Sequence, residues 1–409
     1  MSWPTVRIGD VADVLPGYAF KSKELGEEGS SLIKIGNILD GGNVDLSNCQ
    51  RLPKNHYLTK YEKFKLRDRD IVIAMTGATA GKVGRIRAAD DEDLLLNQRV
   101  AKFAPRTVNA DFLWFAIGNE KYRAKFYSLG GGAAQPNMSG PQIAAVEIPY
   151  PDLPTQERIA GILSAYDDLI ENNRRRIALL EQAAQLLYRE WFVHFRFPGH
   201  ETAKFVDGLP EGWERVRLES VCARITDGSH ASPKSVDAGF PMASVKDMHD
   251  WGIDTKGCRL ISHDDFDKLV KADCKPLVND VLIAKDGSYL KHCFVIQKEI
   301  DLVILSSIAI LRPNDRIDPH YLSFTLREPH IKERMKGYVS GAALPRIILR
   351  EFRGFEIVLP SDQLQGEWAT RVHPIAQQCG KLIAQNEELT KARDLLLPRL
   401  MDGRIPVKV

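Results

Sequence analysis

The segment Asp70-Ile71-Val72-Ile73-Ala74 returns later in the chain as Asp280-Val281-Leu282-Ile283-Ala284. Both copies are apolar, strand-like runs that follow a turn signal. Sliding the whole chain along itself by about 210 residues brings other landmarks into register in the same order. They are Trp3 with Trp213, Val6-Arg7-Ile8 with Val216-Arg217-Leu218, Phe112-Leu113 with Tyr321-Leu322, Gly132-Ala133-Ala134-Gln135-Pro136 with Gly341-Ala342-Ala343-Leu344-Pro345, Glu147-Ile148 with Glu356-Ile357, and Pro151 with Pro360. This order predicts a tandem duplication rather than two unrelated α+β domains.

Each copy ends in a segment of different character, in which apolar residues alternate steps of three and four as in a coiled coil. The first segment runs from Pro154 to about Trp191, and the second from Pro374 to about Leu400. Asn173 and Asn386 fall on equivalent positions, which favours pairing of the two helices, although two exposed polar interruptions would give the same pattern. The residues predicted to pair the helices are Ile159, Leu163, Tyr166, Ile170, Asn173, Ile177, Leu180, Ile383, Asn386, Leu389 and Leu396.

Composition adds a few bounds. The chain has 409 residues, a formal net charge of +2 and no signal peptide or membrane-spanning stretch, so we expect a cytosolic protein. The six cysteines form no CxxC pair and lie at no zinc-ligand spacing, which predicts reduced, mostly buried thiols. If the ligand is a nucleic acid, the near-neutral charge requires the cations to be gathered on part of the surface.

Catalytic motifs are not evident in the sequence. Gly77-Ala78-Thr79-Ala80-Gly81-Lys82 resembles a phosphate-binding loop, but it has three residues between its glycines where the motif needs four, and Val83 replaces the required Ser or Thr. No GxGxxG follows a strand, and the signature of amino-methyltransferases is missing. Asp254-Thr255-Lys256 and Asp273-Cys274-Lys275 have nuclease-like spacing without the upstream Pro-Asp pair. These observations favour a binding protein without metal ligands or catalytic residues.

Both copies contain a turn of small residues with a nearby lysine, which would let backbone N–H groups approach phosphates or base edges. The turn is Thr76 to Thr79 followed by Lys82 in one copy and Asp286 to Tyr289 followed by Lys291 in the other. A plain β-turn is the rival interpretation. The candidate DNA-contacting residues are Lys34, Thr76, Gly77, Thr79, Lys82, Gln98, Arg99, Gly132, Gln135, Asn137, Lys246, Lys285, Gly287, Ser288, Tyr289, Lys291, Ser307, Gly341 and Arg346.

Over its whole length the chain resembles the specificity subunit of Type I restriction-modification systems. The residues that carry the resemblance are Ile148-Pro149-Tyr150-Pro151-Asp152-Leu153-Pro154-Thr155-Gln156-Glu157-Arg158-Ile159-Ala160, then Leu187-Tyr188-Arg189-Glu190-Trp191-Phe192-Val193-His194-Phe195-Arg196-Phe197-Pro198, then Leu209-Pro210-Glu211-Gly212-Trp213. The resemblance implies two target recognition domains, each reading half of a split site in double-stranded DNA. It also implies docking of two methyltransferase subunits and of restriction/translocase subunits, which would carry S-adenosylmethionine, ATP and Mg, with no cofactor in this chain.

We therefore predict an α+β protein with two tandem α/β target recognition domains separated by two long antiparallel coiled-coil helices, in pseudo-twofold symmetry. The predicted boundaries are 1–150, 151–198, 199–360 and 361–409. Pro374 is expected to interrupt the second helix, and Gln365-Gly366-Glu367 only loosely repeats Gln156-Glu157-Arg158, so looser docking is expected there. Two alternatives stay open, namely a DNA-modifying enzyme with an unrecognised site and a coiled-coil scaffold without a DNA role.

Overall fold

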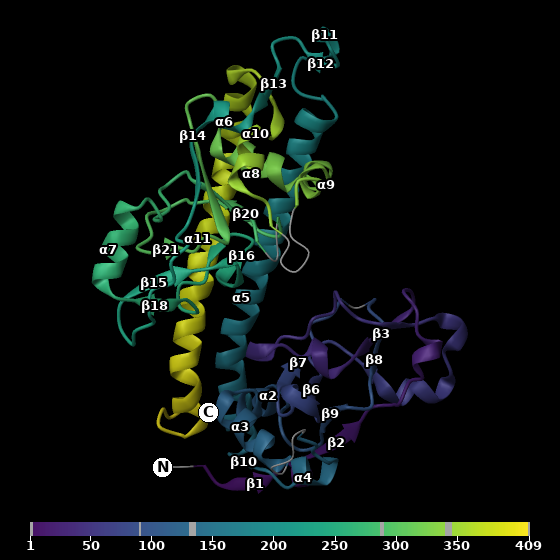
Figure 1. Cartoon of the computed structure of the whole chain (residues 1–409). Coiled ribbons are helices and arrows are strands. Elements are labelled where there is room, and N and C mark those ends of the chain that lie inside the picture. The colour runs from purple at the N-terminus through teal and green to yellow at the C-terminus, as the bar shows by residue number, and fades with distance from the viewer. Residues whose placement is uncertain (1–2, 90, 131–135, 287–289, 340–345, 408–409) are drawn as a thin grey trace. The chain divides into compact units, whose positions relative to one another are not determined.

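The computed structural model describes residues 3–89, 91–130, 136–286, 290–339 and 346–407 (Figure 1). The chain divides into two compact units. The first comprises Met1–Glu171 and Glu387–Val409, and the second comprises Asn172–Asn386. Each unit therefore contains one globular domain and one end of each long helix. None of the described helices is both long enough and apolar enough to cross a lipid bilayer.

The first unit contains two four-stranded sheets and a two-stranded one. The first sheet has the order β2 (Ala12–Pro16), β9 (Val100–Pro105), β6 (Ile71–Ala74), β7 (Val83–Arg85), and the second β4 (Arg51–Leu52), β3 (Ser30–Ile33), β8 (Leu94–Leu96), β5 (Lys65–Leu66). β1 (Thr5–Arg7) pairs antiparallel with β10 (Glu147–Pro149). The helices of the domain are α1 (Ile8–Val11), α2 (Ala110–Ile117), α3 (Glu120–Leu129) and α4 (Gly140–Ala144).

The second unit repeats this topology. Its main sheet has the order β14 (Cys222–Asp227), β22 (Ile308–Pro313), β19 (Val281–Ala284), β20 (Cys293–Val295), and a smaller sheet has the order β18 (Arg259–Ile261), β15 (Phe240–Ala243), β21 (Val303–Ile304). β13 (Glu214–Arg217) pairs with β23 (Glu356–Leu359), as β1 does with β10. Two hairpins, β11 (Phe205–Val206) with β12 (Leu209–Pro210) and β16 (Met248–His249) with β17 (Gly252–Ile253), complete the strands. The helices are α6 (Leu218–Val221), α7 (His263–Lys271), α8 (Pro319–Arg327), α9 (Pro329–Lys336) and α10 (Leu349–Gly354).

The strand order confirms the duplication that the sequence predicts. β6 and β19, which carry the repeated apolar runs, are central strands of the two main sheets, and every residue in both strands is buried. The helices that begin near Phe112 and Tyr321 are also equivalent, because Asn109 and Asp318 cap α2 and α8 through their side chains. The six cysteines are free, and five of them are buried.

The two long helices are α5 (Leu153–Tyr188), which continues into a short π-helix, and α11 (Asp362–Met401). The expectation that Pro374 interrupts the second helix is wrong, because the helix begins at Asp362 and passes through the proline. An interior proline costs about 3 kcal/mol, mainly through a lost hydrogen bond and a steric clash. Burial of Trp368 and Val372, both fully excluded from solvent in the core of the second unit, offsets that cost.

In each unit the two helix ends run antiparallel. In the first unit Leu163 of α5 and Leu400 of α11 share a core, and Trp3 donates its indole N–H to the Leu400 carbonyl at 3.0 Å. In the second unit Ile177 packs with Cys379 and Leu382. Of the other residues predicted to pair the helices, Ile159 and Leu396 belong to the first of these cores and Leu180 and Ile383 to the second. Ile170 is buried, and Tyr166 and Leu389 are half-buried.

The matched asparagines contact each other directly. The Asn173 side-chain amide donates to Oδ1 of Asn386 at 3.0 Å, and Asn173 is 2% exposed. Asn173 is therefore a buried polar residue with a partner, not an exposed interruption. This hydrogen bond can form only when the helices keep this register.

Candidate nucleic-acid interface

Backbone hydrogen bonds bring several of the predicted contact residues of the first domain together. The Met75 N–H donates to the Arg99 carbonyl at 2.9 Å, and the Met138 N–H donates to the Met75 carbonyl at 2.9 Å. Thr76 and Asn137 face each other in an isolated antiparallel bridge. The segment after β6 is thus held between the segment before β9 and the chain around Asn137.

This arrangement places four polar side chains around one surface pocket. Thr76, Gln98, Arg99 and Asn137 line it with Met75 and Pro136. Gln98, Arg99 and Asn137 are exposed, whereas the Thr76 hydroxyl is buried and has no hydrogen-bond partner among the described residues. Amide and guanidinium groups can make bidentate hydrogen bonds to adenine and guanine edges, so this set suits base contacts.

The second domain repeats the same backbone contacts with different side chains. The Lys285 N–H donates to the Ser307 carbonyl at 3.0 Å, and the Ile347 N–H donates to the Lys285 carbonyl at 3.0 Å. Asp286 and Arg346 form the bridge that corresponds to Thr76 and Asn137. We call these two equivalent sets of backbone contacts the bridge frames. The frames are shared, but the functional groups they present differ at every one of these positions.

Lys285 was predicted to contact DNA, which requires an exposed side chain, but it is buried. Its ammonium lies 3.3 Å from an Asp227 carboxylate oxygen and 3.4 Å from one of Asp286, and the residue is 6% exposed. Two carboxylates neutralise the charge, and this compensation explains how a lysine can be buried here. In the second bridge frame the exposed cation is therefore Arg346.

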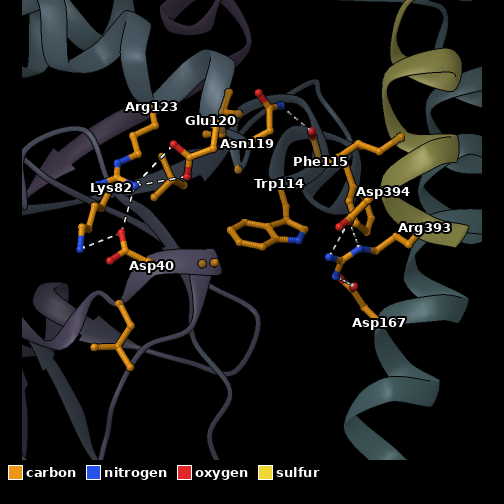
Figure 2. Close-up of a pocket in the computed structure, with 17 residues that line it drawn as sticks. Asp40, Lys82, Trp114, Phe115, Asn119, Glu120, Arg123, Asp167, Arg393 and Asp394 are labelled. Atoms are coloured by element: carbon orange, nitrogen blue, oxygen red, sulfur yellow. Dashed lines mark hydrogen bonds and ion pairs between the residues drawn. The ribbon is translucent and has the colours of Figure 1, made fainter. Parts of the chain in front are cut away.

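The Lys82 side chain lines a different pocket from the one at the first bridge frame. Its ammonium is 2.9 Å from an Asp40 carboxylate oxygen, and its side chain is 15% exposed. Figure 2 shows Lys82 and Arg123 meeting Asp40 on one side of Trp114, with Arg393 bound to Asp167 and Asp394 on the other side. Hydrogen bonding from Lys82, and the charges of Lys82 and Arg123, lower the pKa of Asp40. The charges in this pocket of about 300 Å³ therefore largely neutralise one another.

The expected equivalence of Lys82 and Lys291 is wrong. The carbonyl of Lys82 accepts from the Ala74 N–H, and the carbonyl of His292 accepts from the Ala284 N–H in the same register. His292 contacts Asp250 at 3.0 Å, as Lys82 contacts Asp40. Lys291 follows the end of β19 by one residue fewer than Lys82 follows the end of β6. His292, not Lys291, therefore occupies the position that corresponds to Lys82.

The turn after β6 also leaves little backbone available for phosphate. The N–H groups of Gly77, Ala80, Gly81 and Lys82 donate to the carbonyls of Pro136, Gly77, Ala74 and Thr79, respectively. Gly77 has a φ of 75°, which suits glycine at this tight turn. The glycine-rich stretch therefore serves the bridge frame, and its side chains rather than these amides are available to a ligand.

The remaining predicted residues have scattered positions. Lys34 donates to the Gln50 side chain, the Thr79 hydroxyl contacts the Thr76 carbonyl at 3.5 Å, and Lys246 and Lys291 are exposed. The Ser307 hydroxyl accepts from the Val245 N–H at 3.3 Å. The following predicted residues lie outside the described part of the chain: Gly132, Gln135, Gly287, Ser288, Tyr289 and Gly341.

The sequence reasoning missed Tyr18. Its carbonyl accepts from the Gln98 N–H at 2.9 Å, and its N–H donates to the Leu96 carbonyl at 3.0 Å, so it is joined to the first bridge frame. Tyr18 also carries the Lys60 ammonium 5.1 Å from its ring centroid. The alternation of lysines and aromatics between Lys54 and Lys65 is the signal that could have identified this part of the domain.

Two domains of one topology each present their own set of polar side chains on a shared bridge frame. No cluster of metal-ligating side chains occurs among the described residues.

Comparison with known proteins identifies the family. A family model described as "Type I restriction modification DNA specificity domain" matches residues 1–182 and again residues 210–391, so the chain belongs to this family and supplies DNA sequence specificity. The Type I restriction enzyme MjaIX specificity subunit of Methanocaldococcus jannaschii is 27% identical over 77% of this chain and 74% of its own. The EcoBI specificity subunit of Escherichia coli is 22% identical over 96% of this chain and 84% of its own.

A solved structure shares the fold. The S subunit of a Type I restriction-modification system from M. genitalium covers 100% of this chain and 97% of its own, with a TM-score of 0.58 at 17% identity. At that level of identity the likeness concerns the fold alone.

Proposed function

We propose that this chain reads a bipartite, asymmetric site in double-stranded DNA, one half with each domain. The observation that carries the proposal is the pair of bridge frames, in which Thr76, Arg99 and Asn137 correspond to Asp286, Ser307 and Arg346. Asn137 and Arg346 are both exposed, and an arginine favours guanine where an asparagine favours adenine. Two frames with such different side chains select different bases, so the two half-sites differ in sequence.

The same proposal makes the chain a non-catalytic subunit without a cofactor of its own. S-adenosylmethionine, ATP and Mg belong to the methyltransferase and restriction subunits in this scheme. The internal hydrogen bonds of the Gly77 to Lys82 turn support this part of the proposal, because they leave the loop unable to wrap a nucleotide phosphate with those amides. A cytoplasmic location follows from the DNA target and agrees with six free cysteines.

Two methyltransferase subunits, and through them the restriction subunits, are the proposed protein partners. Within the second unit α5 exposes Leu179 and Leu186, which are 65% and 54% accessible and lie seven residues apart on one face of the helix. Exposed leucines in this spacing suit packing against an apolar helix of a partner. The relatives are named as subunits of restriction enzymes, which supports an assembly of this kind.

A domain exchange tests the proposal. The chain is purified with its methyltransferase subunits, and the methylated adenines of DNA exposed to the complex are sequenced. Replacing residues 1–150 with the first domain of another specificity subunit is expected to change one half of the methylated site and leave the other half unchanged. A change in both halves, or methylation of DNA by the isolated chain, would overturn the proposal.

A further inference from the structure

The lobe of the first domain built on β3, β4, β5 and β8 has lysines stacked on aromatic rings. Its core contains Tyr18, Phe20, Tyr61 and Phe64, with Tyr18 centred 5.0 Å from Tyr61 and 5.3 Å from Phe64. The Lys60 ammonium lies 5.1 Å from the Tyr18 centroid and 5.3 Å from that of Tyr61. Lys63 lies 5.0 Å from the centroid of Phe64. These stacked positions limit the freedom of two long side chains while leaving their ammonium groups in water.

Charge in the segment 51–69 of this lobe is strongly one-sided. Residues 51–69 contain seven Lys and Arg but only two acidic residues, Glu62 and Asp68. Lys65 is paired with Glu62 and Asp93, and Arg69 with Asp111. Within the described part of the chain no carboxylate lies within ion-pair distance of Lys60 or Lys63. Their charge is therefore available to an anionic ligand.

This basic, aromatic segment is joined to the surface proposed to read bases. Tyr18, under Lys60, is bonded through its backbone to Gln98, which lines the pocket of the first bridge frame. Gly17 lets the chain before Tyr18 pack closely against Asn97, because a Cβ at this position would lie only 2.2 Å from the Asn97 carbonyl oxygen. Lys60 is thus joined to Gln98 and Arg99 through one residue, Tyr18, whose ring contacts Lys60 and whose backbone is bonded to Gln98.

In the described part of the second domain, the position equivalent to Tyr18 holds no aromatic residue. Ser229, whose carbonyl accepts from Ser306, stands where Tyr18 stands in the first domain. Residues 261–279 contain the acidic helix α7 with Asp264, Asp265 and Asp267, and their three lysines are outnumbered by four aspartates. Lys275 in this segment is already paired with Asp301 and Glu299. The equivalent segments 51–69 and 261–279 of the duplicated fold therefore differ in charge.

We propose that Lys60 and Lys63 bind the phosphate backbone of the DNA that flanks the half-site of the first domain, an asymmetry that the second domain does not share. The proposal rests on the proposed function, because it assumes that Gln98 and Arg99 face DNA. Ammonium groups stacked on aromatic rings act here as fixed point charges for phosphate, and their binding releases condensed counterions. They position the duplex and strengthen binding without selecting bases.

The test measures binding of duplex DNA to the complex with methyltransferase subunits over a range of salt concentrations. The probes are a duplex with the methylated site and a duplex of equal length without it. For the variant K60A/K63A the slope of log affinity against log salt is expected to become shallower by about 0.9 per lost phosphate contact, about 2 in all. Both probes are expected to lose affinity by the same factor.

Two control variants separate this idea from its rivals. K60R/K63R is expected to restore the slope, and K268A/K271A, at exposed lysines on helix α7 of the second domain, is expected to leave it unchanged. An unchanged slope in K60A/K63A with a normal thermal unfolding curve would overturn the inference. Failure of the unmodified complex to prefer the site would instead overturn the proposed function, so the two failures are distinguishable.

Discussion

A buried glutamine at the start of each long helix offers the sharpest stability test. Gln156 is fully buried; its Oε1 accepts from the Asn109 N–H at 2.9 Å, and its Nε2 donates to the Pro151 carbonyl at 2.8 Å. It therefore joins α5 to the residue that caps α2. Replacement by alanine removes both hydrogen bonds and leaves two backbone groups without a partner.

The magnitude follows from these contacts. A typical hydrogen bond contributes about 0.5–1.5 kcal/mol net, and a buried backbone group left unpaired costs about 1–3 kcal/mol. The Pro151 carbonyl is buried, whereas the Asn109 N–H is only partly buried. We therefore expect Gln156→Ala to lower the free energy of unfolding by about 2–4 kcal/mol. Gln365→Ala is expected to cost a similar amount, because Gln365 bonds to the Asp318 N–H and the Pro360 carbonyl at 3.1 Å each.

Urea denaturation followed by tryptophan fluorescence measures the loss of unfolding free energy. Hydrogen exchange read by mass spectrometry locates it, since Gln156→Ala is expected to expose amides of α2 and the first turns of α5, and Gln365→Ala those of α8 and α11. Exposed neighbours supply matched controls, and Glu157→Ala and Gln363→Ala are expected to change stability by no more than about 0.5 kcal/mol. A cost below about 1 kcal/mol for both glutamine variants would refute the assignment of these contacts.

Three further predictions concern buried polar groups. Asn173→Leu with Asn386→Leu is expected to raise the melting temperature while weakening selection of one helix register, which cross-linking across the helices reads out; unchanged register would contradict this role. Asp111→Asn is expected to destabilise the first unit by about 3 kcal/mol in a urea titration, because Arg85 would lose its carboxylate partner. The Arg85 side chain is 2% exposed, and burial lowers its pKa to about 10. Burial lowers the pKa of His320 to about 4, so the folded state resists its protonation. As the pH falls from about 6.5 to about 4, the free energy of unfolding is expected to decrease by up to about 1.4 kcal/mol per pH unit. The variant His320→Gln should lack this contribution.

The window of the pH prediction is set by three groups in contact. His373 bonds to Asp318 at 2.7 Å, which raises the pKa of His373, so its stabilising contribution is complete below about pH 6.5 and is lost only at higher pH. The pKa of Asp318 is lowered, with burial opposing and the His373 hydrogen bond favouring the charged form, so its contribution is lost only toward pH values below about 4. Between these limits His320 is the member of the cluster whose protonation differs between folded and unfolded chains.

Sequence periodicity was sufficient to predict the fold class, because the duplication and the helix-pairing residues are properties of local pattern. It failed where tertiary contacts overrule that pattern. Pro374 looks like a helix break until Trp368, one turn and a half earlier, is seen fully buried. Lys82 and Lys291 look equivalent until the strand register shows that His292 occupies the position of Lys82. Lys285 looks like a surface cation because nothing in its neighbourhood of the sequence reveals Asp227.

The candidate interface shows the same division between backbone and side chain. The bridge frames are made by N–H and carbonyl groups, which every residue except proline supplies, so the frame survives replacement of Thr76 by Asp and of Asn137 by Arg from one domain to the other. The contacts that join each domain to its helices are instead made by side chains, and there both domains use glutamine at Gln156 and Gln365. Side chains at the frame therefore differ between the domains while the backbone frame is kept, whereas the side chains at the helix junction are the same in both. Such a separation allows one fold to hold two readers of different sequence in the same chain.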